Sequence, residues 1–170
     1  MKRLITILAL TLTAAAAGCG GTATVTKTKT VTVTPAARSN EIAQFGYVKS
    51  LERKGSGYEM RFDPALLLSG QTANVAAAED GVVPIGQPVP NDNYVLDEGH
   101  RLLTYEVPAD AHVTALTKGV AGSPITVAEL AQLVRGENPF PKPLFEPITT
   151  GFWIRIDVDT VRSLDQQYHP

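Results

Sequence analysis

The sequence predicts a mainly β domain with two short helices, an α+β fold arranged as a small, mostly antiparallel and partly open barrel of OB-like type. Three observations predict it. Several short stretches alternate apolar and polar residues with a period of two, which is typical of half-buried strands. Turns rich in glycine or proline separate these stretches. Only two stretches carry helix signals, so strands dominate.

The predicted strands begin with a hairpin. Residues 44–53 and 58–63 alternate in bulk on either side of the turn 54–57, which contains two glycines. We expect Asp63-Pro64 to end the second strand, because proline cannot donate a ladder hydrogen bond. The remaining predicted strands lie within residues 91–98, 101–107, 111–116, 151–158 and 161–168. The last two form a terminal hairpin, in which Phe152, Ile154, Ile156 and Val158 share one face.

Two helices interrupt the strands. Residues 69–81 are rich in alanine and end at Gly81, which predicts a short helix with a glycine just past its end. Thr126 and Glu129 have the spacing of a capping box, which predicts a second helix that stops at Gly136. We expect this helix to pack on the sheet through one apolar face, formed by Val127, Leu130, Leu133 and Val134.

A similar four-residue pattern occurs near both ends of the domain. Val48-Lys49-Ser50-Leu51 recurs as Val161-Arg162-Ser163-Leu164. Two strands of one pattern could pair and close the barrel, which would remove the exposed sheet edges. Coincidence explains a match of this length equally well.

The N-terminus has the order of residue types found in a signal peptide. Lys2 and Arg3 precede an uncharged stretch, residues 4–17, of about 14 residues, which is too short to cross a membrane as a helix. The stretch ends in Ala16-Ala17-Gly18-Cys19, which resembles the lipobox of bacterial lipoproteins, with alanine where leucine is commonest. We expect cleavage before Cys19 and acylation of its thiol, palmitate included. The alternative is ordinary secretion with an incidental cysteine.

The chain divides into a signal peptide (1–18), a lipidated cysteine with a threonine-rich tether (19–40) and a single β-rich domain (41–170). The tether alternates threonine with valine or lysine but offers little apolar bulk to bury. Because Cys19 is the only cysteine, the acylated chain can form neither a disulfide nor a cysteine-ligated metal site. The expected location is the extracytoplasmic face of the cell membrane, with the lipid as anchor.

Composition and motifs argue against several functions. The net charge is -2 and no dense run of lysine or arginine occurs, so we expect no nucleic-acid partner. The sequence lacks a nucleophile elbow, a His-Glu-x-x-His pair, a phosphate loop and a dinucleotide-binding motif. We therefore expect no cofactor and a monomeric, non-enzymatic protein. An enzyme stays an alternative, because folding can bring scattered residues together.

The richest polar cluster in the domain contains Asp92, Asp97, Glu98 and His100. Calcium prefers carboxylate and amide oxygens, so Asp92, Asp97 and Glu98 are the candidate metal ligands. Their spacing does not match the calcium loop of an EF-hand. The alternative is a turn in which Asn91 and Asp92 bond to their own backbone, while Asp97 and Glu98 are solvated.

The candidate ligand-binding residues are two aromatic residues, Trp153 and Tyr94, and two polar residues, Asp92 and His100. Barrels often bind ligands on aromatic faces, although aromatic residues on strands are commonly part of the core. Trp153 alternates with the apolar residues on either side of it, which places it on the outer face of its strand. The proline-rich segment 139–147 could cover it and form a second small core.

Five segments carry a resemblance to a family of uncharacterised exported proteins and lipoproteins of Gram-positive bacteria. They are GYVKSL (46–51), FDPA (62–65), AAAEDG (76–81), NDNYV (91–95) and DQQYHP (165–170). The resemblance implies an exported single domain and adds no activity, since none is established for that family. We expect a cell-envelope lipoprotein that binds a small ligand or an envelope protein. The alternatives are an exported enzyme without a recognisable motif and a scaffold that acts only through protein contacts.

Overall fold

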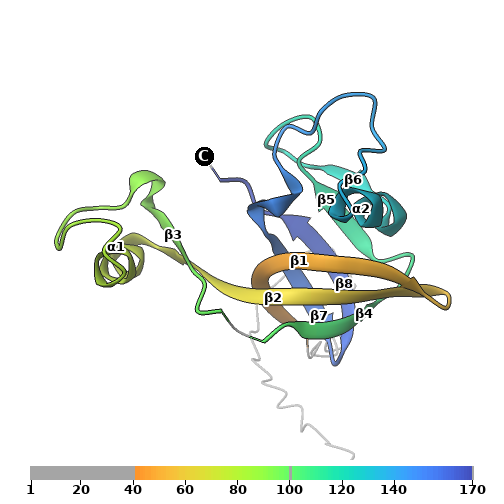
Figure 1. The fold of residues 1–170 in the computed structure, drawn as a ribbon, viewed down its shortest axis with the longest axis horizontal. Coiled ribbons are helices and arrows are strands. Elements are labelled where there is room, and N and C mark those ends of the chain that lie inside the picture. Colours follow the sequence, from red (N-terminus) through yellow and green to blue (C-terminus); the bar gives the residue numbers. More distant parts are fainter. Residues whose placement is uncertain (1–40, 100, 170) are drawn as a thin grey trace, which may run out of the picture. The chain divides into compact units, whose positions relative to one another are not determined.

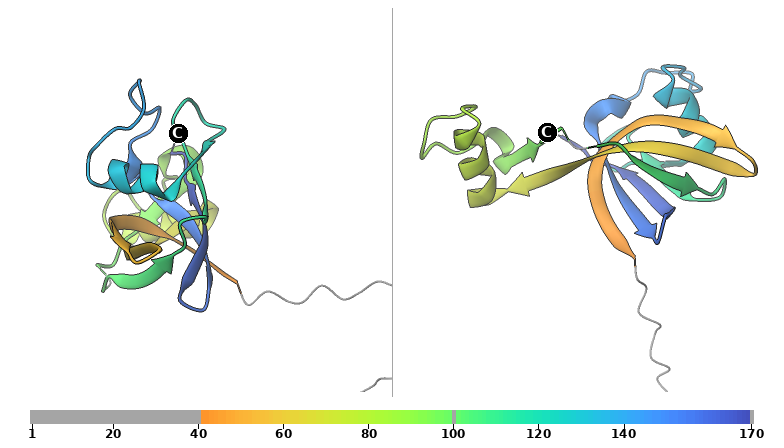
Figure 2. Two further views of the ribbon diagram at one scale, coloured as in Figure 1. Left: turned by 90° about the vertical axis from the view of Figure 1, so that its right-hand side faces the viewer. Right: turned by 60° about the horizontal axis from the view of Figure 1, so that its bottom comes forward.

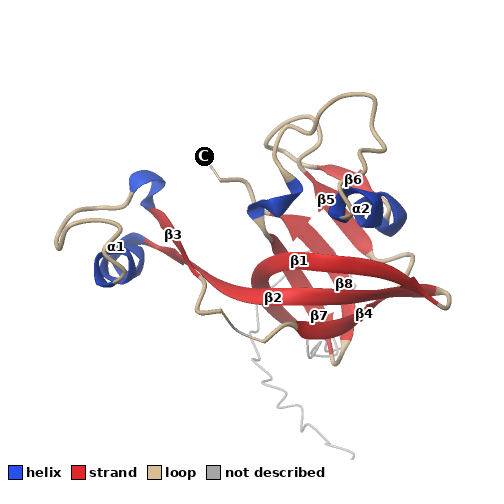
Figure 3. Cartoon of the chain, viewed as in Figure 1, coloured by secondary structure: helices blue, strands red, loops and turns tan. Residues whose placement is uncertain are grey.

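The computed structural model describes residues 41–99 and 101–169. Strands predominate in these ranges, as Figure 3 shows. The elements are β1 (Ile42–Lys54), β2 (Gly57–Ser69), α1 (Gly70–Glu79), η1 (Pro90–Asp92), β3 (Asn93–Leu96), β4 (Leu103–Val107), β5 (His112–Ala115), β6 (Ser123–Ile125), α2 (Val127–Val134), η2 (Ile148–Thr150), β7 (Phe152–Asp157) and β8 (Thr160–Gln166). Neither α1 nor α2 has the length and apolar character needed to cross a bilayer.

Five strands close a small barrel (Figure 1). β1 pairs antiparallel with β2 on one edge and with β7 on the other. β4 pairs with the other edge of β2, and β8 pairs with the other edge of β7. A parallel bridge between Glu106 and Thr160 joins β4 to β8. The predicted α+β fold class, an OB-like and mostly antiparallel barrel, is confirmed.

β5 and β6 extend the barrel sheet. β5 pairs parallel with β8 through Val113 and Leu164, and β6 pairs antiparallel with β5. β4 and β5 therefore occupy successive parts of the same edge of β8. The predicted break at Pro108 separates them, because the proline lacks the amide needed to continue the ladder.

The barrel core follows the predicted alternation. Phe152, Ile154 and Ile156 of β7 point inward and are buried, as is Leu164 of β8. α2 packs on this core through its apolar face, with Val127 and Leu130 fully buried. The capping box is present, since the Thr126 hydroxyl accepts from the Glu129 amide at 3.1 Å while a Glu129 carboxylate oxygen accepts from the Thr126 amide at 2.7 Å.

The expectation that Asp63-Pro64 ends the second strand is wrong. β2 continues through Pro64 to Ser69. On one edge of β2 the pairing with β4 stops at Phe62, and the pairing with β3 starts at Leu66. Pro64 lies in the interval between these two partners, where its missing amide costs no ladder bond on that edge.

Two expectations about the terminal hairpin also fail. β1 pairs with β7 rather than with β8, so the repeated four-residue pattern does not close the barrel. Val158 does not share the buried face of β7, because it occupies the β7–β8 turn with a φ of 58° and is 82% exposed. The turn begins one residue earlier than the alternation of apolar residues suggests.

The outer half of β2 leaves the barrel and pairs with β3, as Figure 2 shows. α1 packs on this two-stranded ribbon and buries Ala73 and Ala77 against Val89. Leu68 of β2 and Tyr94 of β3 complete this second, smaller core. The predicted helix is thus confirmed, and its small residues allow it to lie close to the ribbon.

Candidate functional site

The candidate site is a cleft where β1 and β2 separate. Their last paired residues are Phe45 and Ala65. Beyond this pair, the N-terminal part of β1 follows β7 while β2 continues along β3 (Figure 2, right). The cleft has a volume of about 370 Å³ and is named here the open-edge cleft. It is lined by Ala43, Gln44, Phe45, Pro64, Ala65, Leu66, Leu67, Leu68, Glu98 and Trp153.

The open-edge cleft runs along the backbone of β2. Residues 64–68 all line it, although their side chains alternate between the two faces of the strand. β3 lies on the opposite edge of β2, and among the described residues no strand pairs with residues 66–69 on the cleft side. Alternate residues of an unpaired strand edge present their amide and carbonyl groups to the space beside it.

Trp153 forms the aromatic wall of the cleft. It lies opposite Phe45 on β1, which in turn lies opposite Ala65 on β2, so the three form a row across the outer face. The Trp153 and Phe45 ring centroids are 5.4 Å apart, and the indole amine donates to the Gln167 side-chain oxygen at 3.0 Å. Trp153 is still 36% exposed. The predicted outer-face position is confirmed.

The proline-rich segment does not line the Trp153 side of the molecule. Phe140 and Phe145 instead line a separate groove beside β6, and Phe145 lies next to Tyr168 with ring centroids 6.1 Å apart. The suggested cover over Trp153 is therefore wrong. The indole ring faces the open-edge cleft.

Two glycines let the strands approach closely beside the cleft. At Gly46, a Cβ atom would lie 2.2 Å from the Asp63 carbonyl oxygen, so only glycine fits where β1 crosses β2. At Gly151, with a φ of 98°, a Cβ would lie 2.6 Å from the Phe45 ring. Gly46 therefore lets β1 and β2 approach closely, and Gly151 leaves room for the Phe45 ring beside Trp153.

Charged groups surround Tyr47, whose ring lies next to the cleft residue Phe45, with ring centroids 6.0 Å apart. Lys49 pairs with Asp63 at 2.9 Å, and its ammonium lies 5.3 Å from the centre of the Tyr47 ring. Burial raises the pKa of Tyr47, and the carboxylate of Asp97 raises this pKa further while Lys49 opposes the shift. Lys49 offsets the charge of Asp63. Asp97 precedes Glu98, which lies in the cleft wall.

The structure does not bring Tyr94 or Asp92 to Trp153. The Tyr94 hydroxyl donates to the Asp80 carboxylate at 2.7 Å, and this hydrogen bond raises the pKa of Tyr94. Asp92 is exposed in η1 with a φ of 58°. Neither residue lines the open-edge cleft. His100 and Cys19 lie outside the described residues.

The described part of the chain holds no group of three or more histidine, cysteine or acidic side chains placed to bind a metal ion. The Asp97 carboxylate accepts from the Gly99 amide at 3.0 Å and so makes a local turn of its own, whereas the sequence alternative placed the turn at Asn91 and Asp92. Glu98 faces the cleft, and Asp92 lies in η1. The structure therefore does not gather the three candidate metal ligands, Asp92, Asp97 and Glu98, into one site.

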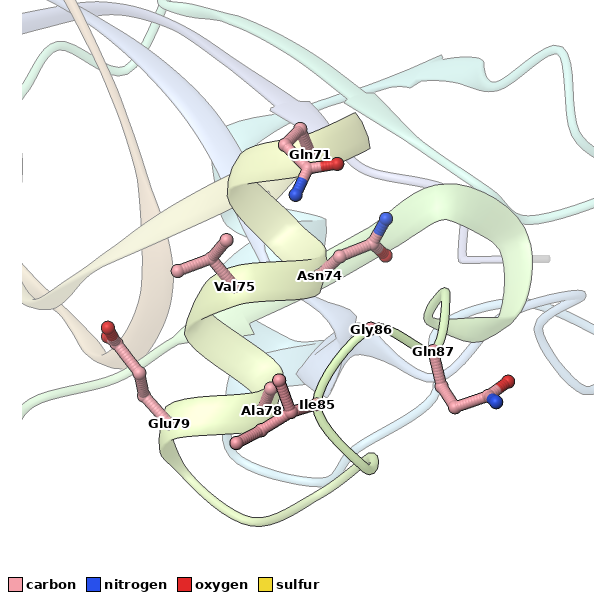
Figure 4. Close-up of a pocket in the computed structure, with 8 residues that line it drawn as sticks. All are labelled: Gln71, Asn74, Val75, Ala78, Glu79, Ile85, Gly86 and Gln87. Carbon is pink, nitrogen blue, oxygen red and sulfur yellow. The ribbon is translucent and has the colours of Figure 1, made fainter.

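A second hollow, about 420 Å³ in volume, lies between α1 and the loop that follows it (Figure 4). The Asn74 side-chain oxygen accepts from the Val89 amide at 2.8 Å and so ties this loop to the helix. Amide and apolar side chains dominate the lining, and Glu79 is its only ionisable residue. This composition supplies neither an aromatic wall nor a set of convergent charges.

Sequence reasoning found Trp153 but missed the β2 edge beside it. The missed residues are Leu66, Leu67 and Leu68, which were placed after the expected end of the strand. Their run of three leucines was the available signal, since an uninterrupted apolar run is consistent with a strand.

No protein-family model, no curated protein and no solved structure matches this chain. The resemblance to uncharacterised exported proteins of Gram-positive bacteria therefore stays a prediction.

Proposed function

We propose that this protein is a lipid-anchored, non-enzymatic binding module on the outer side of the cell membrane, and that it binds an extended polypeptide segment of another envelope protein. The observation that carries the proposal is the unpaired edge of β2 in the open-edge cleft, beside Trp153. An extended peptide that adds to such an edge gains main-chain hydrogen bonds and places alternate side chains in flanking pockets.

The side chains around the edge suit such a peptide. Leu66 is 52% exposed and lies next to a shallow apolar hollow on the α1 side of β2. Trp153 offers aromatic contact on the barrel side, supported from below by the buried Phe45 ring.

The outer face of the barrel supports a polypeptide rather than a nucleic acid as partner. Glu52, Glu59 and Glu106 lie opposite one another across β1, β2 and β4. A barrel face that binds an oligonucleotide must tolerate its phosphates. Lys54 pairs with Glu59, and the carboxylates of Glu52 and Glu106 on the strands to either side disfavour phosphates.

The proposed cellular location rests on the sequence. Lys2 and Arg3, the uncharged stretch and the Ala-Gly-Cys ending support export and acylation at Cys19, and the membrane contact is then made by the lipid. The likeness to exported Gram-positive proteins supports the same location. It says nothing about the partner.

Peptide display on the full-length protein tests the binding mode. Random short peptides selected on the parent chain should lose binding when Trp153→Ala or Leu66→Lys is introduced, because the first removes the aromatic wall and the second places a charge at the edge. Methylation of alternate peptide amides should abolish binding for one set of positions and spare the other, since only one edge of the peptide pairs with β2.

Val158→Lys is the matched control, because Val158 is also an exposed apolar residue and lies on the β7–β8 turn, away from the cleft lining. Selected peptides should bind this variant as they bind the parent. If selection yields no peptide whose binding depends on Trp153 and Leu66, the proposed binding mode is wrong.

The anchor is tested separately. Cys19→Ala should move the protein from the membrane fraction to the medium or soluble envelope fraction, because a diacylglyceryl group supplies the two chains needed for stable anchoring. Cell fractionation followed by immunoblotting measures the change. A variant that stays as membrane-bound as the parent would contradict the lipoprotein assignment.

A further inference from the structure

A larger groove lies on another part of the surface, between the β5–β6 connection and residues 140–145. It is named here the proline-rich groove, and its volume is about 690 Å³. Sites for small molecules commonly enclose about 300 to 1,000 Å³. The groove shares no lining residue with the open-edge cleft.

Hydrogen bonds to backbone groups fix the walls of the proline-rich groove. The Phe145 amide donates to the Thr117 carbonyl at 3.3 Å, which joins the two walls. The Asn138 side chain accepts from the Phe140 amide and donates to the Lys142 carbonyl, both at 2.9 Å. Prolines at positions 141 and 143 further restrict the backbone. A preformed groove loses little conformational entropy when a ligand binds.

The lining combines an apolar surface with positive charge. Ile125, Phe140 and Phe145 supply apolar area, and Phe145 is 47% exposed. Lys118 and Lys142 are the only charged residues that line the groove. Neither forms a salt bridge with a carboxylate of the described residues. Two unpaired ammonium groups beside an apolar surface attract an anion whose remaining part is apolar.

We infer that the proline-rich groove binds a small amphipathic anion, a molecule with an apolar body and one carboxylate or phosphate group. Lys118 and Lys142 contact the anionic end, and Ile125, Phe140 and Phe145 contact the apolar body. Carboxylate and phosphate share the same requirement for positive donors, so the two forms are separated by experiment.

The geometry favours a small molecule over an added strand. β6 is the last strand of the sheet and borders the groove, but Pro124 stands at its centre. Because proline lacks an amide donor, it prevents regular pairing along this edge. A peptide that adds to β2 therefore finds no equivalent edge here.

The geometry also favours a small molecule over a membrane surface. Lysines with exposed aromatic residues occur on surfaces that dock onto anionic lipid. Such a surface must project its apolar residues outward. Here Phe140 and Phe145 line a concave groove, into which a molecule enters.

The test uses the full-length chain with Cys19→Ser, which cannot be acylated, and isothermal titration with decanoate, decyl phosphate and decyltrimethylammonium. The two anions should bind with a stoichiometry of one, and the cation should bind at least about tenfold more weakly, because it meets two ammonium groups. Lys118→Gln and Lys142→Gln should each weaken anion binding about tenfold. Phe145→Ser should weaken both anions.

Arg61→Gln is the matched control, since it removes one exposed positive charge from β2 and should leave affinity unchanged. Both lysines are exposed, so circular dichroism should find each variant folded. Preference for decanoate or for decyl phosphate identifies the anionic group. Equal binding of the cation, unchanged affinity in the lysine variants, or binding only to vesicles of phosphatidylglycerol would overturn the inference.

Discussion

Removal of residues 151–170 should abolish cooperative folding. These residues include β7 and β8, which supply two of the five barrel strands and the partners of β1, β4 and β5. Each fully buried apolar side chain in them contributes about 1.5 to 3 kcal/mol, and Phe152, Ile154 and Leu164 are all buried. Far-ultraviolet circular dichroism and denaturant titration measure the loss. A truncated chain with a sigmoidal unfolding transition would contradict the expectation.

A point variant tests the same core without removing strands. Ile154→Ala should lower the free energy of unfolding by about 2 to 5 kcal/mol, because it removes a transfer term and leaves a cavity. Trp153→Ala is the comparison on the neighbouring position and should cost less, since the ring is partly exposed. Equal losses at the two positions would mean that Trp153 belongs to the core.

Gly46→Ala should be the most damaging single methyl addition in the described chain. The new Cβ would lie 2.2 Å from the Asp63 carbonyl oxygen and 2.8 Å from the Phe62 ring. Because backbone lies on one side and a buried ring on the other, the strands must separate, which we expect to cost about 3 kcal/mol or more. Urea denaturation measures the change in the free energy of unfolding.

Gly119→Ala is the matched control, because a Cβ at Gly119 meets no atom within 4 Å and its φ needs no glycine. We expect no loss, or a gain of about 0.4 to 1 kcal/mol from the reduced freedom of the unfolded chain. A Gly46→Ala variant as stable as the Gly119→Ala variant would show that β1 and β2 approach each other less closely.

Local patterns were enough to predict most of the elements. Thr126 and Glu129 located the start of α2, and Gly81 located the end of α1, because capping and positive φ leave specific residue types in the sequence. The alternation in β7 predicted both its buried face and the outward position of Trp153. The OB-like class followed from the number and spacing of strands.

Properties that depend on distant partners could not be predicted. Pro64 was expected to end β2, but the interval between β3 and β4 on one edge makes a proline harmless there. The neighbours of β1 depend on how β7 returns to it, and no local pattern records that. The open-edge cleft exists only because two strands separate after Phe45 and Ala65. No short motif specifies such a site.

The barrel has one seam much weaker than the others. β4 and β8 meet through a single residue pair, Glu106 with Thr160, and the Glu106 amide donates to the Asp159 carbonyl at 3.0 Å. The other strand pairs of the barrel each extend over five residue pairs or more. Opening this seam breaks few bonds, so the Glu106 amide should exchange with solvent through local fluctuations, while the paired amides of β1 and β7 should exchange only on global unfolding.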